Sequence, residues 1–218
     1  MKPFYSRFNT NFGDHLNSWL WKRLCPDLTD DNKQLRLIGV GTLLSRDLDL
    51  VPGKKVVFGS GAGYASPPTV EQAASWDIRA LRGPLTAKIM GIDEGLAITD
   101  AAWLVALLPE YRDSPTQKSG VSFVPHWRTS ERAGFFYHSR NYVKPTLRDA
   151  RTITFSTLTK TNIPGIKSWD EPHAKKLCQI LKNLCKLKPS LSKDAVREEK
   201  IERLSAAFLS MRRDYKEK

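Results

Sequence analysis

A succession of short apolar runs, each ending in a glycine-rich turn, constrains the fold of this chain more than any other feature. One run covers residues 35–44 and contains Gly39-Val40-Gly41, and another covers residues 55–58 and leads into Gly59-Ser60-Gly61-Ala62-Gly63. Short buried strands that feed glycine-rich loops are typical of parallel sheets in α/β proteins. The pattern therefore predicts an α/β fold with a Rossmann-like parallel sheet in the first half of the chain.

Helix and strand signals around these runs fit the same fold. Apolar residues at helical spacing predict a helix over residues 14–24, and residues 77–81 predict a further strand. Pro84 suits the first turn of a helix that runs to residue 90, because the missing N–H costs nothing there. We expect the sheet to extend over residues 35–108, with a strand in the 96–108 segment followed by a helix or a buried run.

A polar stretch with two prolines, residues 109–119, predicts a linker between two regions. We expect residues 1–112 to form an N-terminal Rossmann-like lobe. Residues 113–218 are then a shortened C-terminal lobe with basic closing helices. The elements expected in it are strands over residues 120–125 and 150–156 and helices over residues 174–187 and 193–213.

Charge separates the two halves of the chain, whose formal net charge is +12. Residues 1–120 hold 14 basic and 13 acidic side chains, whereas residues 121–218 hold 21 and 10. A basic segment attracts polyanions such as nucleic acids, acidic lipid surfaces or phosphorylated substrates. Aromatic platforms for single-stranded nucleic acid are not interleaved with these charges, which argues against nucleic acid as the partner.

The last predicted helix carries one apolar stripe on an otherwise basic surface. A stripe of this kind packs against its own domain or lies on a membrane surface, and we favour packing against the domain. The alternative is peripheral contact with the inner face of the membrane through the basic C-terminal helices. The residues of the stripe are Ile201, Leu204, Phe208, Met211 and Tyr215.

Apolar runs and cysteine content indicate a cytoplasmic protein. The longest apolar runs, such as residues 101–108, fall far below the roughly 18–20 residues that span a bilayer. The first residues lack the apolar core of a secretory signal. The 3 cysteines match no zinc spacing, and no pair of histidines is spaced as metal ligands, so we predict no metal site.

Two segments of the first half have the composition of anion or hydroxyl sites. Asn11, Gly13 and Asp14 lead directly into a predicted helix, whose free N–H groups and positive dipole end attract anions. Asp14 has the alternative role of a helix cap. The loop that begins Gly59-Ser60-Gly61 lets backbone N–H groups approach a phosphate closely. Its alternative role is a tight turn after a strand.

Arg82 and His126 are the further candidates. Arg82 precedes Gly83-Pro84 at another predicted helix start, where its guanidinium suits a carboxylate or phosphate. The alternative is a surface arginine paired with Asp77 or Asp100. His126 follows the strand predicted over residues 120–125, at the edge where α/β proteins bind ligands, or else it is a structural histidine.

Taken in order, six short motifs over residues 4–130 resemble bacterial polysaccharide pyruvyl transferases. The resemblance implies a two-lobed architecture similar to B-type glycosyltransferases. It also implies transfer of the pyruvyl group of phosphoenolpyruvate onto two sugar hydroxyls as a cyclic ketal. The motifs are Asn11-Phe12-Gly13-Asp14-His15-Leu16-Asn17, Leu37-Ile38-Gly39-Val40-Gly41-Thr42-Leu43-Leu44, Val57-Phe58-Gly59-Ser60-Gly61, Leu81-Arg82-Gly83-Pro84-Leu85-Thr86-Ala87, Thr99-Asp100-Ala101-Ala102 and Phe123-Val124-Pro125-His126-Trp127.

The resemblance gives each candidate residue an expected role. We expect no cofactor, because phosphoenolpyruvate is the donor substrate and a saccharide, lipid-linked or soluble, is the acceptor. A homo-oligomer is left open. The catalytic candidates are His126, Arg82 and Asp14, and the substrate-binding candidates are Asn11, Gly13, Gly59, Ser60, Gly61 and Asp100.

The second half departs from the family pattern. Between residues 128 and 173 no Met-His-Gly type motif is present, and two lobes of about 100–150 residues each would exceed the 218 residues here. We therefore predict a pyruvyl transferase of exopolysaccharide or cell-wall polymer synthesis that is weak or inactive through truncation. The alternatives are a B-type-like glycosyltransferase and a non-enzymatic relative that binds polyanions or a partner.

Overall fold

A computed structural model describes residues 1–5, 12–112, 121–124, 151–154 and 194–216 of the chain. The chain forms two compact units, one made of Met1–Arg112 with Ser192–Lys218 and the other of Asp113–Leu191. The first contains all the candidate residues of the N-terminal motifs that the structure describes.

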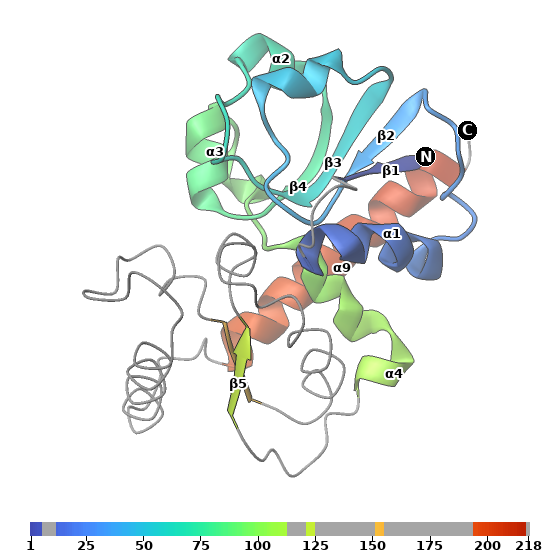
Figure 1. The fold of residues 1–218 in the computed structure, drawn as a ribbon, viewed down its shortest axis with the longest axis vertical. Coiled ribbons are helices and arrows are strands. Elements are labelled where there is room, and N and C mark those ends of the chain that lie inside the picture. Colours follow the sequence, from blue (N-terminus) through green and yellow to red (C-terminus); the bar gives the residue numbers. More distant parts are fainter. Residues whose placement is uncertain (6–11, 113–120, 125–150, 155–193, 217–218) are drawn as a thin grey trace, which may run out of the picture. The chain divides into compact units, whose positions relative to one another are not determined.

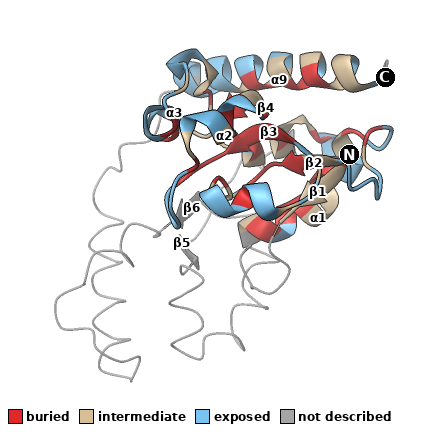
Figure 2. Ribbon diagram, turned by 90° about the horizontal axis from the view of Figure 1, so that it is seen from above, coloured by how far each residue is buried: buried red, intermediate tan, exposed pale blue. Residues whose placement is uncertain are grey.

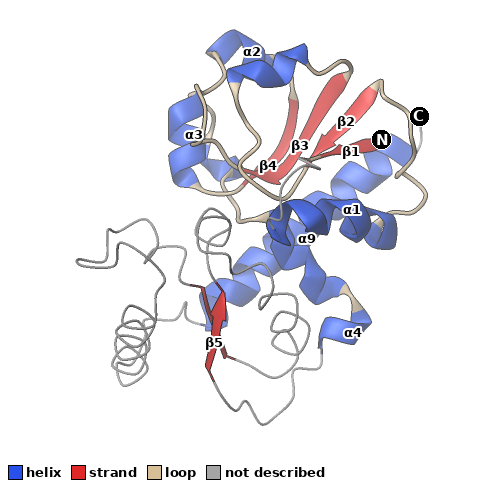
Figure 3. Cartoon of the chain, in the orientation of Figure 1, coloured by secondary structure: helices blue, strands red, loops and turns tan. Residues whose placement is uncertain are grey.

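The first unit is built on a parallel sheet of β1 (Lys2–Phe4), β2 (Leu35–Ile38), β3 (Lys54–Ser60) and β4 (Asp77–Leu81). The strands lie in the order β1-β2-β3-β4, and every neighbouring pair is parallel (Figure 3). The predicted α/β class with a Rossmann-like parallel sheet is confirmed. The sheet also includes β1, which we did not predict, because three residues are too few to show an alternating pattern.

The structure contains the helices predicted for the first unit and several short ones that were not predicted. The predicted helix over residues 84–90 is confirmed, with Pro84 in its first turn and Gly91 at its end. The strand predicted within residues 96–108 is wrong, because Asp100 caps a 3-10 helix there. The helices are α1 (Phe12–Leu24), η1 (Arg46–Leu50), α2 (Val70–Ala74), α3 (Pro84–Met90), η2 (Glu94–Leu96), η3 (Ala101–Leu107), α4 (Pro109–Arg112) and α9 (Asp194–Lys216).

Helices cover both faces of the sheet. Successive strand residues point to opposite sides, and the apolar residues of β3 lie on both of them. Val56 and Phe58 of β3 join a cluster with α1, η3 and α9, whereas Val57 joins a cluster with η1, α2 and α3 (Figure 1). β3 is buried along nearly its whole length (Figure 2). Such continuous burial explains why this strand reads as an apolar run rather than as an alternating one.

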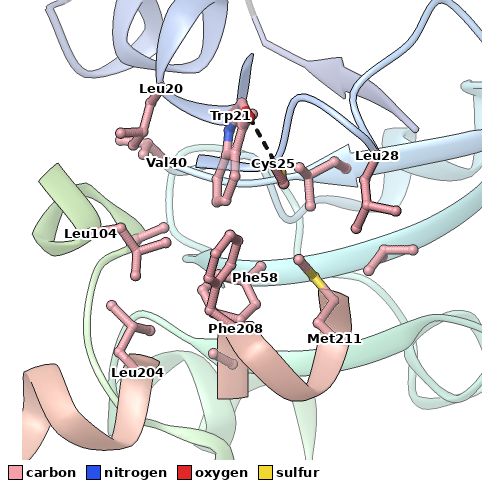
Figure 4. Packing of buried hydrophobic residues seen from close by; sticks show 14 of the residues in the cluster. Leu20, Trp21, Cys25, Leu28, Val40, Phe58, Leu104, Leu204, Phe208 and Met211 are labelled. Atoms are coloured by element: carbon pink, nitrogen blue, oxygen red, sulfur yellow. Dashed lines mark hydrogen bonds between the residues drawn. The ribbon is translucent and has the colours of Figure 1, made fainter. Parts of the chain in front are cut away.

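Three aromatic rings link the layers of the first cluster. Trp21 of α1 meets Phe58 of β3 edge-to-face with ring centroids 6.1 Å apart, and Phe58 meets Phe208 of α9 at 5.9 Å (Figure 4). Rings of this size each bury about 150–250 Å², so this column supplies much of the apolar contact between the sheet and its helices.

The apolar stripe of α9 packs in the core of the first unit. Leu204, Phe208 and Met211 are buried there, so the favoured interpretation of the stripe is confirmed. The alternative, in which this stripe lies on a membrane surface, is wrong because these side chains are not exposed. Residues 113–218 also do not form one lobe, since α9 belongs to the first unit with residues 1–112.

The second unit contains β5 (Val121–Val124) and β6 (Arg151–Thr154), which pair in parallel. Both strands were predicted, over residues 120–125 and 150–156. The helix predicted over residues 174–187 lies outside the described residues. None of the helices that the structure describes is long and apolar enough to cross a membrane.

Candidate functional site

The loops that follow β2, β3 and β4 are joined to one another at the carboxyl edge of the sheet. The Gly61 N–H donates to the Gly41 carbonyl at 3.0 Å, and the Arg82 N–H donates to the Ser60 carbonyl at 2.9 Å. The Leu44 N–H in turn donates to the Gly61 carbonyl at 3.1 Å. Ligands of open α/β sheets bind at this edge, so the three loops lie where the sequence placed the site.

Arg82 lies directly on the backbone of Gly61. A Cβ atom built on Gly61 would come within 2.4 Å of the guanidinium carbon of Arg82, so only glycine leaves room for this side chain. The guanidinium donates through Nη1 to Thr42 Oγ1 at 2.6 Å and to the Gly41 carbonyl at 3.5 Å. The structure thus brings Arg82 and the glycine loop together, as the sequence predicted.

The partners of Arg82 are neutral groups. None of the ion pairs between described residues involves it. The alternative pairing with Asp77 is wrong, because that carboxylate binds Arg79 at 2.6 Å. The charge of Arg82 acts to lower the pKa of Asp100, but the two side chains form no ion pair. A half-buried guanidinium with neutral partners is suited to an anionic ligand.

Asp14 stands beside the same loops. It is buried in the first turn of α1, and its Oδ1 lies 3.2 Å from the position of a Cβ on Gly41. Gly41 has φ +123°, a conformation that favours glycine. Gly13, which precedes Asp14, is half-buried in the same turn. The start of α1 therefore reaches the carboxyl edge next to the turn that Arg82 contacts.

Asn17 fixes α1 in this position. Its Nδ2 donates to the Val40 carbonyl at 2.8 Å, and its Oδ1 accepts from the Val40 N–H at 3.0 Å and from Trp21 Nε1 at 2.9 Å. Gly39 leaves room for this contact, because a Cβ there would come within 2.3 Å of the Trp21 ring. The motif that contains Asn17 thus has a positioning part as well as a candidate ligand part.

Asp100 is held at the edge by a close approach between β3 and η3. Gly59 has φ +75°, and a Cβ on it would lie 2.5 Å from the Ala101 nitrogen. The Asp100 carboxylate caps η3 by accepting the Ala102 N–H at 2.9 Å. Burial raises the pKa of Asp100 above its usual value, although the Ala102 N–H and the charge of Arg82 oppose this. Such a carboxyl retains its proton to a higher pH than an exposed aspartic acid does.

An open cleft of about 320 Å³ adjoins Asp100 on the side of η3 and α4. Its aromatic walls are Trp103 and Tyr111, whose exposed fractions are 41% and 43%. Tyr111 also meets the ring of Trp19 from α1 at a centroid distance of 6.4 Å. The remaining lining residues are Ala102, Val105 and Ala106.

Some candidate residues lie outside the description, and some contributors were missed. Asn11 and His126 are outside the described residues, so their roles stay predictions. Thr42 was missed as the partner of Arg82, and so was the cleft with Trp103. Thr42 follows a glycine turn and Trp103 lies within an apolar run, and no local signal marks either residue as a ligand contact. Among the described residues, no group of three or more His, Cys, Asp or Glu side chains could hold a metal ion.

Comparison with known proteins identifies a relative. The chain is 44% identical over 131 residues to the succinoglycan biosynthesis protein ExoV of Rhizobium meliloti, and the match covers 60% of this chain and 41% of ExoV. No family model and no solved structure matches. With the six motifs in order, this relationship supports the predicted resemblance to polysaccharide pyruvyl transferases.

The similarity to ExoV gives the carboxyl edge a context. The described members of the N-terminal motifs are the groups that meet there: Asp14 beside Gly41, Gly61 beneath Arg82, and Asp100 at the start of η3. The chain matches about two fifths of the length of ExoV.

Proposed function

We propose that the chain takes part in pyruvyl transfer from phosphoenolpyruvate to two hydroxyls of a saccharide during exopolysaccharide synthesis. The observation that carries the proposal is the position of Arg82 at the carboxyl edge of the sheet. Its guanidinium lies against the backbone of Gly61 and has neutral hydrogen-bond partners. The relationship to a succinoglycan biosynthesis protein supports the polymer class.

The reaction sets clear chemical requirements. The methylene carbon of phosphoenolpyruvate takes up a proton, one sugar hydroxyl bonds to the neighbouring carbon, and the phosphate leaves. The second hydroxyl then bonds to the same carbon and closes the ketal. One hydroxyl proton ends on the new methyl group and the other on phosphate. The site needs a cation for the departing phosphate, an acid for the methylene carbon and a base for the hydroxyls.

The candidate residues divide among these tasks. In the proposal, Arg82 binds the donor anion, and the loop of Gly59, Ser60 and Gly61, whose Gly61 N–H donates to the Gly41 carbonyl, positions Arg82. Arg82 offers a planar fork of donors, which matches a carboxylate or a phosphate in a bidentate way.

The carboxylates serve the acceptor and the protons. Asp14 accepts hydrogen bonds from sugar hydroxyls, with Asn11 and Gly13 beside it in the sequence. Asp100 is suited to proton transfer because its pKa is raised by burial. His126 is retained as the further acid or base.

The proposed partners follow from the reaction. They are phosphoenolpyruvate and a saccharide acceptor, lipid-linked or soluble, in the cytoplasm. Contact with the inner face of the membrane stays a proposal and needs the basic exposed side of the C-terminal region, because the apolar stripe of α9 is buried. A homo-oligomer also stays a proposal.

Purified full-length chain tests the proposed function. Phosphoenolpyruvate should raise the thermal midpoint of unfolding, and uridine diphosphate should not. Phosphate release with a galactoside acceptor, predicted to be weak, should depend on the acceptor and disappear in Arg82→Ala. Stabilisation by uridine diphosphate without any response to phosphoenolpyruvate would instead indicate a nucleotide-sugar donor and overturn the proposal.

A further inference from the structure

We infer that the cleft between η3 and α4 is a pyranose-binding subsite, formed by Trp103, Tyr111 and Asp100, that holds the acceptor sugar. This inference rests on the proposed function, which requires an acceptor close to the anion site. It assigns a location and residues to that acceptor. None of the six motifs contains Trp103 or Tyr111.

The composition of the cleft fits a sugar ring. Its volume of about 320 Å³ falls in the lower part of the range of about 300–1,000 Å³ for small-molecule sites. Trp103 and Tyr111 remain about two fifths exposed although both lie on helices of the first unit. Such rings present apolar faces with a polar tip, which suits the mixed C–H and hydroxyl surface of a pyranose.

The walls are held in place before any ligand binds. Tyr111 packs against Trp19 of α1, and the neighbouring Glu110 pairs with Arg23 of α1 at 2.6 Å. Asp100 is fixed by the hydrogen bond from the Ala102 N–H. Rigid walls lower the entropic cost of binding, because few side chains must be ordered when the sugar enters.

Asp100 connects the cleft to the anion site. One carboxylate oxygen accepts the Ala102 N–H, and Asp100 also lines the cleft. The charge of Arg82 acts on this same carboxyl. A sugar lying against Trp103 would therefore present hydroxyls to Asp100 and, through it, towards the group proposed to bind the donor. Asp100 is then suited to accept a hydroxyl proton.

Saturation-transfer NMR on the full chain with methyl β-galactopyranoside, without phosphoenolpyruvate, tests the subsite. We expect Trp103→Ala to weaken sugar binding about two- to twelvefold, because an aromatic contact contributes roughly 0.5–1.5 kcal/mol. Trp103→Phe should retain part of the binding, and Asp100→Asn should weaken it while keeping the cap. Leu209→Ala, which truncates an exposed apolar residue of α9, is the matched control and should bind as the wild type does.

Parallel binding of phosphoenolpyruvate separates the two proposals. If the sugar signal is lost in Trp103→Ala but phosphoenolpyruvate still binds, both proposals are supported. If wild type shows no sugar signal, or Trp103→Ala and Asp100→Asn leave it unchanged, the subsite is overturned while donor binding stands by itself. If the wild type binds sugar through Trp103 but does not bind phosphoenolpyruvate, the subsite is supported and the proposed function fails.

Discussion

Arg79 and Arg82 lie three residues apart in the sequence, yet Arg79 contacts carboxylates and Arg82 contacts neutral groups. Arg79 donates to both oxygens of Asp77, at 2.6 and 3.0 Å, and to Asp214 of α9 at 2.5 Å. Tyr215 lies over its guanidinium at 5.8 Å and donates to Asp77 at 2.6 Å. Arg82 has only a hydroxyl and a carbonyl as hydrogen-bond acceptors among the described residues.

The difference shows how a structural cation is told from a binding cation in one strand and its turn. Hydrogen bonds with Asp77 raise the pKa of Arg79, and burial opposes them only in part. Its charge is used within the protein, where it fixes the end of α9 to β4. The charge of Arg82 is not used in this way, and its guanidinium lies on the backbone of Gly61.

The largest expected effect is on donor binding by Arg82→Ala. Because hydrogen bonds to charged groups contribute about 1.5–3 kcal/mol, we expect phosphoenolpyruvate affinity to fall about 100-fold in calorimetry. The free energy of unfolding should change by less than about 0.5 kcal/mol, as for a residue without a structural charge partner. Arg79→Ala is the matched control, and equal affinity in both variants would contradict the division between the two arginines.

Arg79→Ala should instead act on stability. It leaves Asp77 and Asp214 without their shared partner, so we expect a loss of about 2 kcal/mol in the free energy of unfolding by urea denaturation. Phosphoenolpyruvate affinity should remain within about twofold of wild type, since the change lies outside the loops of the site. An unchanged urea midpoint would show that α9 does not depend on this cluster.

Much of the fold was predictable because its signals are local. The strand over residues 77–81 and the helix over residues 84–90 match the structure, since Pro84 and Gly91 mark the ends of that helix. The segment over residues 96–108 was not predictable in the same way. Its apolar residues fit a strand, a helix or a buried run, and the Asp100 cap with the close approach of Gly59 decided for a 3-10 helix.

The candidate site was predictable in its charged and glycine residues but not in its connections. Arg82 and Gly61 follow strands, and the parallel sheet brings such positions together. The bond from Arg82 to Thr42 and the cleft beside Trp103 depend on contacts between segments distant in the sequence. No periodicity or spacing encodes contacts of that kind. The role of Asn17 in holding α1 was missed for the same reason.

A pair of glycine variants sharpens the comparison by moving Arg82 without removing it. Gly61→Ala places a Cβ 2.4 Å from the guanidinium, so the Arg82 side chain must move away from this backbone. We expect phosphoenolpyruvate affinity to fall about tenfold, equal to roughly 1.4 kcal/mol. Gly83→Ala is the control, because a Cβ there meets nothing within 4 Å. Equal affinities in the two variants would show that the position of Arg82 on Gly61 is unimportant for the donor.

The smallest effect should appear in the pH dependence of stability, where the carboxylates of the two surroundings act with opposite sign. Burial works to raise the pKa of Asp77, but hydrogen bonds from Arg79 and Tyr215 lower it below the usual 3.8. Its stabilising contribution is therefore present above that value and lost as the pH falls further. Burial raises the pKa of Asp100, so wild type should lose stability as the pH rises from 3.8 through the raised value.

Urea denaturation of Asp77→Asn and Asp100→Asn between about pH 3 and about pH 7 measures both contributions. At neutral pH Asp77→Asn should be less stable than wild type, with a deficit that shrinks towards low pH. Asp100→Asn should be more stable than wild type at neutral pH, with a gain that shrinks towards low pH. A carboxylate that costs stability in the resting protein is expected where it serves a ligand, because function retains groups that folding disfavours. Parallel pH profiles of the two variants would place Asp100 with Asp77 as a structural group and remove it from the candidate site.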